Sequence, residues 1–359
     1  MNRYIVLVSN DIGGAEKRFY DIFRRLRMNN KNYYLVLPSC LLKKLGAGLH
    51  DEGIIALNVP KWSFGVFIKE YYFNVIRKAN CNDSFHYPLN PLFVFHLGKL
   101  RNFSISYCFC YEQPKLSSKS FGLKLQKIAS FFTKKIDVLN NDVFKFVNVN
   151  TKFSLTPGGT FVNNSVTDDV FLDKKNKIVF LSRLEKGKGV DTFLKLVPCV
   201  YNMLKDVGIC DIEFVVYGKG SLEQFVTNEV DKLVSDGFPI KFDGFQKAEI
   251  ALKNTKLVFS LQDKTNYPSR VVAESLLYGC RVIVLNSGDS HLFGAMNGLS
   301  YLNDDYSNLN ECLVDFIFSE SLDIKDQIKD FQNISSSAKE KFSSENYINY
   351  YKDIFENYE

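Results

Sequence analysis

The chain has 359 residues, more than one hydrophobic core usually organises, so two domains are expected. Its 46% hydrophobic and 24% charged residues are typical of a globular protein, and no apolar run reaches the roughly 18 residues that would cross a membrane. The formal charge of +5 is uneven, because residues 1–170 carry 23 Lys and Arg against 12 Asp and Glu, whereas the remainder carries 22 against 28. A basic first half suits an anionic partner such as a membrane surface, a phosphorylated lipid or nucleic acid.

The eight cysteines are irregularly spaced, and Cys108 and Cys110 fall in one predicted strand. This spacing is neither a disulfide framework nor a paired CxxC zinc site, so reduced, cytosolic thiols and no metal are expected. The first residues, MNRYIVLVSND, are typical of a short strand and lack the apolar core of a signal peptide. A cytoplasmic location is therefore expected.

Strands alternate with helices in the first half. The predicted strands are Tyr4–Ser9, Tyr33–Pro38, Ile54–Val59, Phe85–Tyr87, Phe103–Cys110, Val138–Asn140 and Phe153–Thr156. Helices are predicted from Ala15 to Met28 and from Val66 to Lys78. Such alternation indicates βαβ units and a parallel sheet.

A second alternating series follows the loop-rich stretch Thr160–Asp173, which is interpreted as a linker. Its predicted strands are Ile178–Ser182, Phe214–Tyr217, Ile240–Phe242, Leu257–Ser260 and Val282–Leu285, and its predicted helices are Asp191–Tyr201, Leu222–Val234, Ala248–Asn254 and Arg270–Tyr278. A last amphipathic helix is predicted from Ser344 to Tyr358. The fold class is therefore α/β, with two Rossmann-like halves whose ligands bind outside the carboxyl ends of the strands, in the cleft between the halves.

The stretch from Thr265 to Gly279, TNYPSRVVAESLLYG, predicts a short helix pointed at a polar loop. Pro268 favours an extended or turned entry, Ser269 is a good N-cap, and Gly279 suits the C′ position. The free N–H groups of such a helix, with its positive dipole end, form a ready site for a phosphate. The alternative is an ordinary surface helix with an Arg270–Glu274 ion pair.

Two further loops follow predicted strands. The first, SRLEKGKG, offers Arg183 and Lys188 at a strand end, where a guanidinium fork and an ammonium neutralise a diphosphate. The second, YGKGS, contains Gly218 and only part of a GxGxxG pattern, which is weak evidence for a dinucleotide. Each loop alone is compatible with a structural role, but their order together with the Thr265–Gly279 helix is far more specific.

The order GGAE, SRLEKGKG, YGKGSL, NYPSRVVAESLLYG and RVIV resembles retaining glycosyltransferases of family 4, which have the two-domain GT-B fold. The resemblance covers most of the chain and is strongest from Ile178 to Leu285. The ending FSSENYINYYKDIF is similar to the closing helix of that family, which crosses back to the first domain. The resemblance implies an acceptor-binding domain at residues 1–165, a domain for the nucleotide-sugar donor at 166–340, and a C-terminal helix at 341–359 that packs on the first domain.

The resemblance also implies roles for particular residues. Arg183 and Lys188 match the residues that bind the donor diphosphate and stabilise the leaving group, and Glu274 matches the glutamate that hydrogen-bonds the ribose. The remaining donor-binding positions are Gly13 and Gly14 of the glycine-rich loop, Gly218, and the backbone at Ser269, Arg270 and Val271, where helix N–H groups meet the distal phosphate. Cationic groups and the helix dipole would offset the charge of the leaving nucleotide diphosphate, so no metal and no cofactor are implied.

The sequence departs from the family at two positions. Asn266 replaces the first glutamate of the E-x7-E motif, and its amide can bond sugar hydroxyls but cannot act as a carboxylate. This predicts either a changed donor choice or a slower, degenerate protein. Tyr111 and Glu112 stand where a His-Asp-like pair is frequent, so His86 is the candidate cleft histidine, with a turn residue beside Pro88 as the alternative.

The segment Lys119–Ile136 alternates apolar and lysine residues. A basic amphipathic helix of this kind can rest on an anionic membrane, although a domain helix with a solvated lysine face fits equally well.

The resemblance implies a metal-independent, retaining hexosyltransferase at the inner face of the plasma membrane. Its partners would be a nucleotide-sugar and a lipid-linked glycan acceptor, as in bacterial lipopolysaccharide or capsule synthesis, and not nucleic acid. One alternative is a non-catalytic nucleotide-sugar-binding partner of another transferase. An NAD-dependent oxidoreductase is disfavoured, because DIGGAE lacks GxGxxG spacing and no acidic residue closes the strand Tyr33–Pro38.

Overall fold

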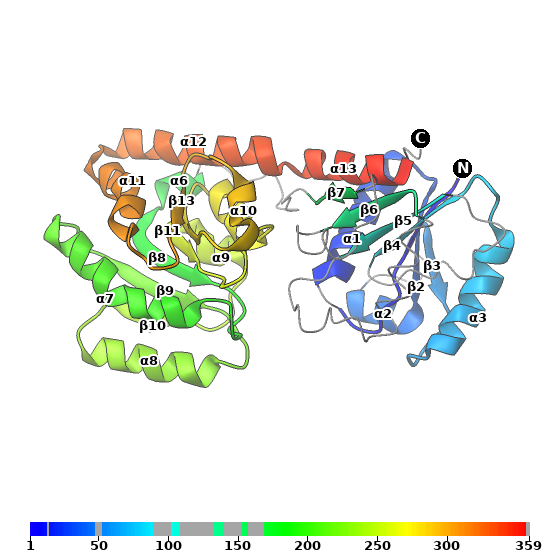
Figure 1. Ribbon diagram of the computed structural model, residues 1–359, viewed down its shortest axis with the longest axis horizontal. Helices are drawn as coiled ribbons and strands as arrows, with labels where there is room; N and C mark the ends of the chain where they lie inside the picture. Colours follow the sequence, from blue (N-terminus) through cyan, green and yellow to red (C-terminus); the bar gives the residue numbers. More distant parts are fainter. Residues whose placement is uncertain are drawn as a thin grey trace. The chain divides into compact units, whose positions relative to one another are not determined.

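The computed structural model describes residues 1–12, 14–46, 52–88, 102–107, 133–138, 153–156 and 169–356. The chain divides into two compact units (Figure 1). Unit 1 comprises Met1–Pro157 together with Tyr347–Glu359, and unit 2 comprises Gly158–Asn346.

Unit 1 is built on a seven-stranded sheet in the order β3-β2-β1-β4-β5-β6-β7. The strands are β1 (Arg3–Val6), β2 (Tyr33–Pro38), β3 (Ile54–Leu57), β4 (Ser84–Pro88), β5 (Asn102–Tyr107), β6 (Lys135–Val138) and β7 (Phe153–Leu155). All neighbours pair in parallel. The order 3-2-1-4-5-6 is that of a Rossmann domain, extended here by one strand, as the alternation of elements predicted.

The helices of unit 1 are α1 (Gly14–Asn29), α2 (Ser39–Leu45), α3 (Phe64–Asn74) and the 3₁₀ turn η1 (Ile76–Lys78). The sequence did not indicate α2, because its seven residues are too few to establish a helical period. Leu41 and Leu42 bury its inner side, and Gly46 ends it at a φ of 69°. Thus a short helix directly follows β2.

The last helix, α13 (Ser344–Glu356), completes unit 1. Tyr351, Ile354 and Phe355 are buried. The Tyr33 hydroxyl donates to Glu356 at 2.6 Å, and Lys135 Nζ lies 2.6 Å from an Asp353 carboxylate oxygen. A C-terminal helix thus returns to the first domain, as the resemblance implied.

The predicted basic helix Lys119–Ile136 is wrong at its end, because β6 begins at Lys135. Lys135 and Ile136 pair with β5, and Ile136 is buried. The predicted strand Val138–Asn140 shares only Val138 with β6, and residues 139 and 140 lie outside the described part of the chain. Residues 119–132 lie outside the described part of the chain.

Unit 2 is built on a six-stranded parallel sheet in the order β10-β9-β8-β11-β12-β13. The strands are β8 (Lys175–Leu181), β9 (Glu213–Tyr217), β10 (Ile240–Phe242), β11 (Thr255–Ser260), β12 (Arg281–Leu285) and β13 (Leu299–Leu302). The helices are α6 (Asp169–Leu172), α7 (Val190–Asp206), α8 (Glu223–Ser235), α9 (Ala248–Lys253), α10 (Arg270–Leu277), η4 (Gly288–Phe293), α11 (Leu309–Ser321) and α12 (Ile324–Phe342). This is again the Rossmann order, so the predicted fold class is confirmed.

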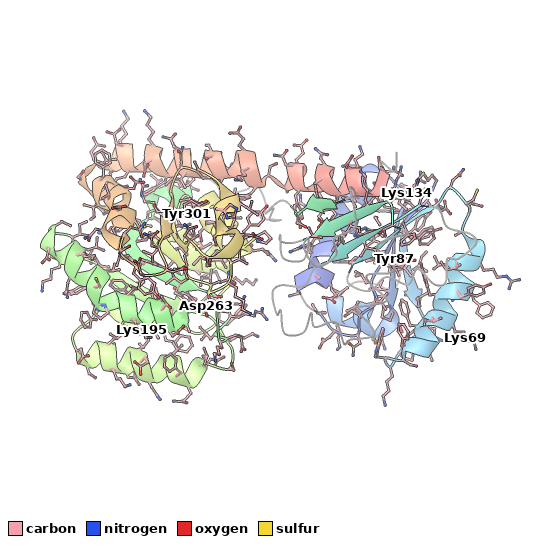
Figure 2. The ribbon with its side chains drawn as sticks, viewed as in Figure 1. Lys69, Tyr87, Lys134, Lys195, Asp263 and Tyr301 are labelled. Atoms are coloured by element: carbon pink, nitrogen blue, oxygen red, sulfur yellow. The ribbon has the colours of Figure 1, made fainter. Side chains whose placement is uncertain are left out.

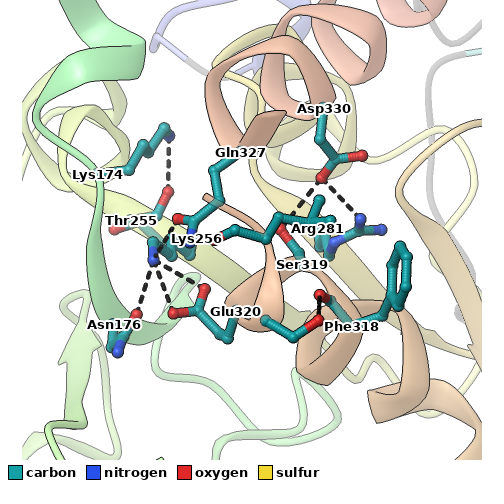
Figure 3. A network of polar contacts seen from close by, with 12 residues as sticks. Lys174, Asn176, Thr255, Lys256, Arg281, Phe318, Ser319, Glu320, Gln327 and Asp330 are labelled. Carbon is teal, nitrogen blue, oxygen red and sulfur yellow. Dashed lines mark hydrogen bonds and ion pairs between the residues drawn. The ribbon is translucent and has the colours of Figure 1, made fainter. Parts of the chain in front are cut away.

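The amino ends of the unit 2 strands are fastened to α11 and α12 by a polar network (Figure 3). Lys256 Nζ lies 2.8 and 2.9 Å from the two carboxylate oxygens of Glu320, and it also donates to Asn176 and Gln327. Arg281 forms a second ion pair with Asp330 at 2.7 Å. These contacts stabilise the edge opposite to the one at which a Rossmann sheet binds ligands.

Candidate functional site

The loops that follow β8, β9 and β11 meet at the carboxyl edge of the unit 2 sheet. Two glycines permit this close approach. A Cβ at Gly189, whose φ is 84°, would lie 1.9 Å from the Leu261 carbonyl oxygen, and a Cβ at Gly218 would lie 2.0 Å from the Ser182 oxygen. The order of the sheet reverses between β8 and β11, which is the switch point where such sheets bind ligands. The three loops therefore converge at this point.

The loop after β8 presents two cationic side chains in different settings. Arg183 is exposed, and its side chain forms no hydrogen bond or ion pair within the described ranges. Lys188 is partly buried, and its Nζ donates to Oε1 of Gln262 at 2.7 Å. Gln262 follows β11, so it holds Lys188 toward the neighbouring loop, while Arg183 remains available to an anion.

Glu185 ties this loop to the one after β9. Its carboxylate accepts from the Ser221 hydroxyl at 2.5 Å and from the Ser221 N–H at 3.1 Å. These hydrogen bonds lower the pKa of Glu185, with a smaller contribution from nearby Arg183. The sequence interpretation assigned no role to Glu185. The spacing of SRLEKGKG gives no sign that this carboxylate turns toward Ser221.

The helix α10 begins and ends where the sequence predicted. Ser269 is its N-cap, but the serine side chain makes no capping hydrogen bond. In the described part of the chain, no acceptor is found for the N–H groups of Arg270, Val271 and Val272. Gly279 follows the helix with a φ of 70°, the conformation expected of a C′ glycine. The amino end of α10 thus presents unpaired N–H groups beside the switch point.

The ion pair of the alternative interpretation is also present. Arg270 Nη2 lies 2.9 Å from a Glu274 carboxylate oxygen. The Arg270 side chain is 61% exposed, whereas that of Glu274 is only 10% exposed. Because solvent reaches Arg270, this ion pair contributes only a few tenths of a kcal/mol to the stability of the helix. The pair and the unpaired N–H groups coexist, so α10 is more than a surface helix.

Asn266 does not point toward a sugar, contrary to the prediction. It is 1% exposed. Its side-chain oxygen accepts from the Ser260 hydroxyl at 2.8 Å and the Gln262 N–H at 3.2 Å, and its Nδ2 donates to the Leu285 carbonyl at 2.9 Å. Its own N–H donates to the Ser290 hydroxyl at 2.8 Å. Asn266 therefore joins the ends of β11 and β12, and a carboxylate could not make the bond to Leu285.

Asn266→Asp is expected to lower the free energy of unfolding by about 1–3 kcal/mol, or more where the new carboxylate stays charged, because it leaves the Leu285 carbonyl without its donor. Urea unfolding at neutral pH measures this difference. Asn310→Asp on the exposed surface of α11 is the matched control and should change the free energy by less than about 0.5 kcal/mol. Equal unfolding midpoints for the two variants would contradict the role given to Asn266.

His86 is not the cleft residue that the sequence suggested. It lies in β4 with 2% of its surface exposed. Its Nδ1 pairs with the Ser104 hydroxyl at 2.8 Å and its Nε2 with the Ser106 hydroxyl at 2.9 Å. Burial lowers the pKa of His86 to about 3, so the ring is neutral at physiological pH. The central strand position and the packing of Phe355 at 4.6 Å enclose this histidine in unit 1.

His86 belongs to a buried polar cluster that sequence reasoning missed. Asp137 in β6 accepts from Ser106 at 2.8 Å and Thr156 at 2.6 Å. Two hydroxyls of α13 also donate to it, that of Tyr350 at 2.5 Å and that of Tyr351 at 2.8 Å. Four donors satisfy this buried carboxylate, so the cluster anchors the C-terminal helix. The residues are distant in sequence, and no local pattern connects them.

The glycine-rich loop of unit 1 is described only in part. Gly13 lies outside the described residues, and Gly14 begins α1. Ahead of it, Lys44 of α2 donates to the Asn10 carbonyl at 2.9 Å and pairs with Asp11 at 3.2 Å. Tyr111 and Glu112 also fall outside the described ranges. The donor-binding role predicted for this loop therefore stays a prediction.

No group of three or more His, Cys, Asp or Glu residues in the described part of the chain is arranged to hold a metal ion. The six cysteines described are free thiols. None of the helices described is both long and apolar enough to cross a bilayer.

Comparison with known proteins identifies relatives by structure. No protein-family profile matches the chain, and no curated protein is significantly similar in sequence. HepE from Anabaena, solved in complex with UDP, has a TM-score of 0.70 at 14% identity, covering 98% of this chain and 99% of that chain. A glycosyltransferase from Rickettsia africae has a TM-score of 0.64 at 15% identity, covering 99% of both chains.

A third similar structure is WaaG, a glycosyltransferase involved in lipopolysaccharide biosynthesis. Its TM-score is 0.61 at 14% identity, with 99% of this chain and 100% of that chain covered. Such identities establish the fold alone. The chain has the GT-B fold, in which both domains are Rossmann-like.

Proposed function

We propose that this protein is a glycosyltransferase that moves a sugar from a nucleotide diphosphate donor to a glycan acceptor. The observation that carries the proposal is the arrangement at the unit 2 switch point. Arg183, Lys188 and the unpaired N–H groups at the start of α10 lie on loops that converge there. This combination suits a diphosphate. HepE, which shares the fold, has been solved with UDP and with UDP-glucose.

The chemistry proposed for these groups is stabilisation of a leaving nucleotide diphosphate. Negative charge develops on the diphosphate as its bond to the sugar breaks. A guanidinium fork at Arg183, the ammonium of Lys188 held by Gln262, and the N–H groups of α10 would offset that charge without reorganising. Transfer that relies on these groups needs no metal ion. Glu274, in the middle of α10, is proposed to meet the ribose.

The finer features of the function rest on the family resemblance. We infer a retaining, hexose-transferring enzyme in which residues 166–340 bind the donor and residues 1–165 bind the acceptor. The basic first half favours an anionic, lipid-linked acceptor, as in synthesis of a bacterial surface glycan at the cytoplasmic side of the plasma membrane. Involvement of WaaG in lipopolysaccharide biosynthesis supports this direction.

A second candidate is a non-catalytic protein that binds a nucleotide-sugar for another transferase. It is favoured by Asn266, which replaces the motif glutamate and is engaged inside unit 2. Incubating the purified chain with a panel of UDP- and GDP-sugars and a glycan acceptor separates the two functions. Net transfer, or slow donor hydrolysis, is expected for the enzyme.

Binding without turnover of any donor would instead support the second candidate. Thermal unfolding with UDP, GDP and NAD tests the shared nucleotide site. A specific ligand at 100 times its Kd adds about 2.7 kcal/mol to the free energy of unfolding. A nucleoside diphosphate should produce this shift and NAD should not. Stabilisation by NAD alone would overturn both candidates.

A further inference from the structure

The outer face of α3 carries apolar side chains that the core of unit 1 does not use. The inner face is fully engaged, because Phe67 and Tyr71 are buried and the Tyr71 hydroxyl bonds that of Tyr87 at 2.7 Å. The exposed apolar residues are Phe64, Val66, Tyr72 and Phe73, at 50%, 43%, 45% and 49% exposure. The rings of Tyr72 and Phe73 contact each other edge to face at 5.5 Å. Helical spacing places Val66 and Phe73 on the same side of α3, away from the buried Phe67, whereas Phe64 lies on another side. Exposed apolar groups gathered on one side of a helix mark interaction surfaces.

Basic side chains lie on α3 and just before and after it. They are Lys61, Lys69, Arg77 and Lys78, all exposed. In the described ranges, none of these four side chains forms an ion pair or hydrogen bond. Arg77 and Lys78 follow the carboxyl end of α3, where they also stabilise its dipole, but Lys61 and Lys69 have no such structural role. Glu70, which accepts from Asn74 at 3.1 Å, is the single acidic residue between positions 61 and 78.

We propose that the α3 surface, formed by Val66, Tyr72 and Phe73 together with these four basic residues, docks on an anionic lipid bilayer. The aromatic rings would enter the boundary between headgroups and acyl chains, and the lysine and arginine side chains would reach the lipid phosphates. Charge complementarity favours lipid over a second copy of the chain. A two-fold contact would place this basic surface against itself.

The segment Lys119–Ile136 is the other candidate membrane contact. Its residues 119–132 lie outside the described part of the chain, and at its end Lys135 is paired with Asp353. The α3 surface is exposed in the structure as described. The inference does not rest on the proposed transfer activity, because lipid binding is measured without a donor or acceptor.

Sedimentation of the full chain with vesicles tests the proposal. The protein should bind vesicles of phosphatidylcholine with phosphatidylglycerol, and it should bind phosphatidylcholine alone weakly. Lys69→Gln should lower the partition coefficient about fivefold, since each basic residue near an anionic surface is worth about 1 kcal/mol. Replacing Tyr72 and Phe73 together by serine should lower it at least about tenfold.

Matched controls lie on unit 2. Figure 2 marks Lys69 on α3 and Lys195, the exposed control lysine, on α7. Phe318 on α11, at 62% exposure, is the control for the aromatic pair. Lys195→Gln and Phe318→Ser should leave vesicle binding unchanged. Because Lys69 is exposed, Lys69→Gln tests the surface even if the double serine variant unfolds.

Three results would overturn the proposal. The first is wild-type protein that stays in the supernatant with anionic vesicles. The second is an equal loss of binding in the α3 and unit 2 variants. The third is that light scattering detects a dimer, and that Phe73→Ser dissociates this dimer without reducing vesicle binding. The α3 surface would then bind a second copy of the chain.

Discussion

Arg183→Ala and Lys188→Ala are each expected to lower the rate of sugar transfer by about 10²- to 10³-fold. Removing one preorganised group that stabilises developing negative charge typically has an effect of this size. The Arg183 side chain forms no hydrogen bond or ion pair in the described structure, and Lys188 is held by Gln262 at 2.7 Å. Both groups are therefore available in position before the donor binds. Initial rates at saturating donor, together with nucleoside diphosphate affinity, measure the loss.

Lys186→Ala is the matched control for these variants. Lys186 is an exposed lysine of the same loop and matches no diphosphate-binding position of the family. Its replacement should change the rate less than about threefold, because a solvated charge at this distance is screened. Full activity in both Arg183→Ala and Lys188→Ala would remove the basis for the proposed function. A similar loss in all three variants would indicate a general charge effect on donor approach.

The sequence predicted those parts of the candidate site that are determined by residues close together in the chain. Ser269 and Gly279 bound α10 because an N-cap and a left-handed C′ residue depend on a few neighbours. Such features repeat in any sequence that builds the same turns. Motif order could therefore predict which loops converge. The close backbone approaches at Gly189, before α7, and at Gly218, after β9, were not predicted from the sequence.

The predictions that were wrong concern residues whose partners lie far away in the sequence. Asn266 was interpreted by its place in a motif, yet its partners Ser290 and Leu285 come from beyond α10. His86 was interpreted by its place at a strand end, but its burial depends on α13, more than 250 residues later. Hydrogen bonds between distant segments leave no periodic pattern in a sequence. The boundaries of α11 and α12 were also not predicted, although α12 has local signals, an Asp323 N-cap and buried residues at helical spacing.

Lys256→Met is expected to lower the free energy of unfolding by about 3–5 kcal/mol. Lys256 and Glu320 have side-chain exposures of 8% and 10%, so the replacement leaves a carboxylate buried without its counter-ion. Asn176 and Gln327 also lose their donor. Urea unfolding, monitored by far-ultraviolet circular dichroism, measures the change. Lys253→Met, which breaks the exposed pair with Asp173 at 3.6 Å, should cost less than about 1 kcal/mol.

The double variant Lys256→Met/Glu320→Leu separates the attraction between the two charges from the cost of burying them. Replacing both members of a buried pair by apolar groups is often neutral or stabilising, whereas removing one is not. The double variant should therefore recover most of the stability lost by Lys256→Met. The network lies at the amino ends of β8, β11 and β12, away from the nucleotide site. Its loss should therefore weaken nucleotide binding only in proportion to the fraction of unit 2 that is unfolded. A double variant as unstable as the single one would mean that Asn176 and Gln327, rather than Glu320, carry the penalty.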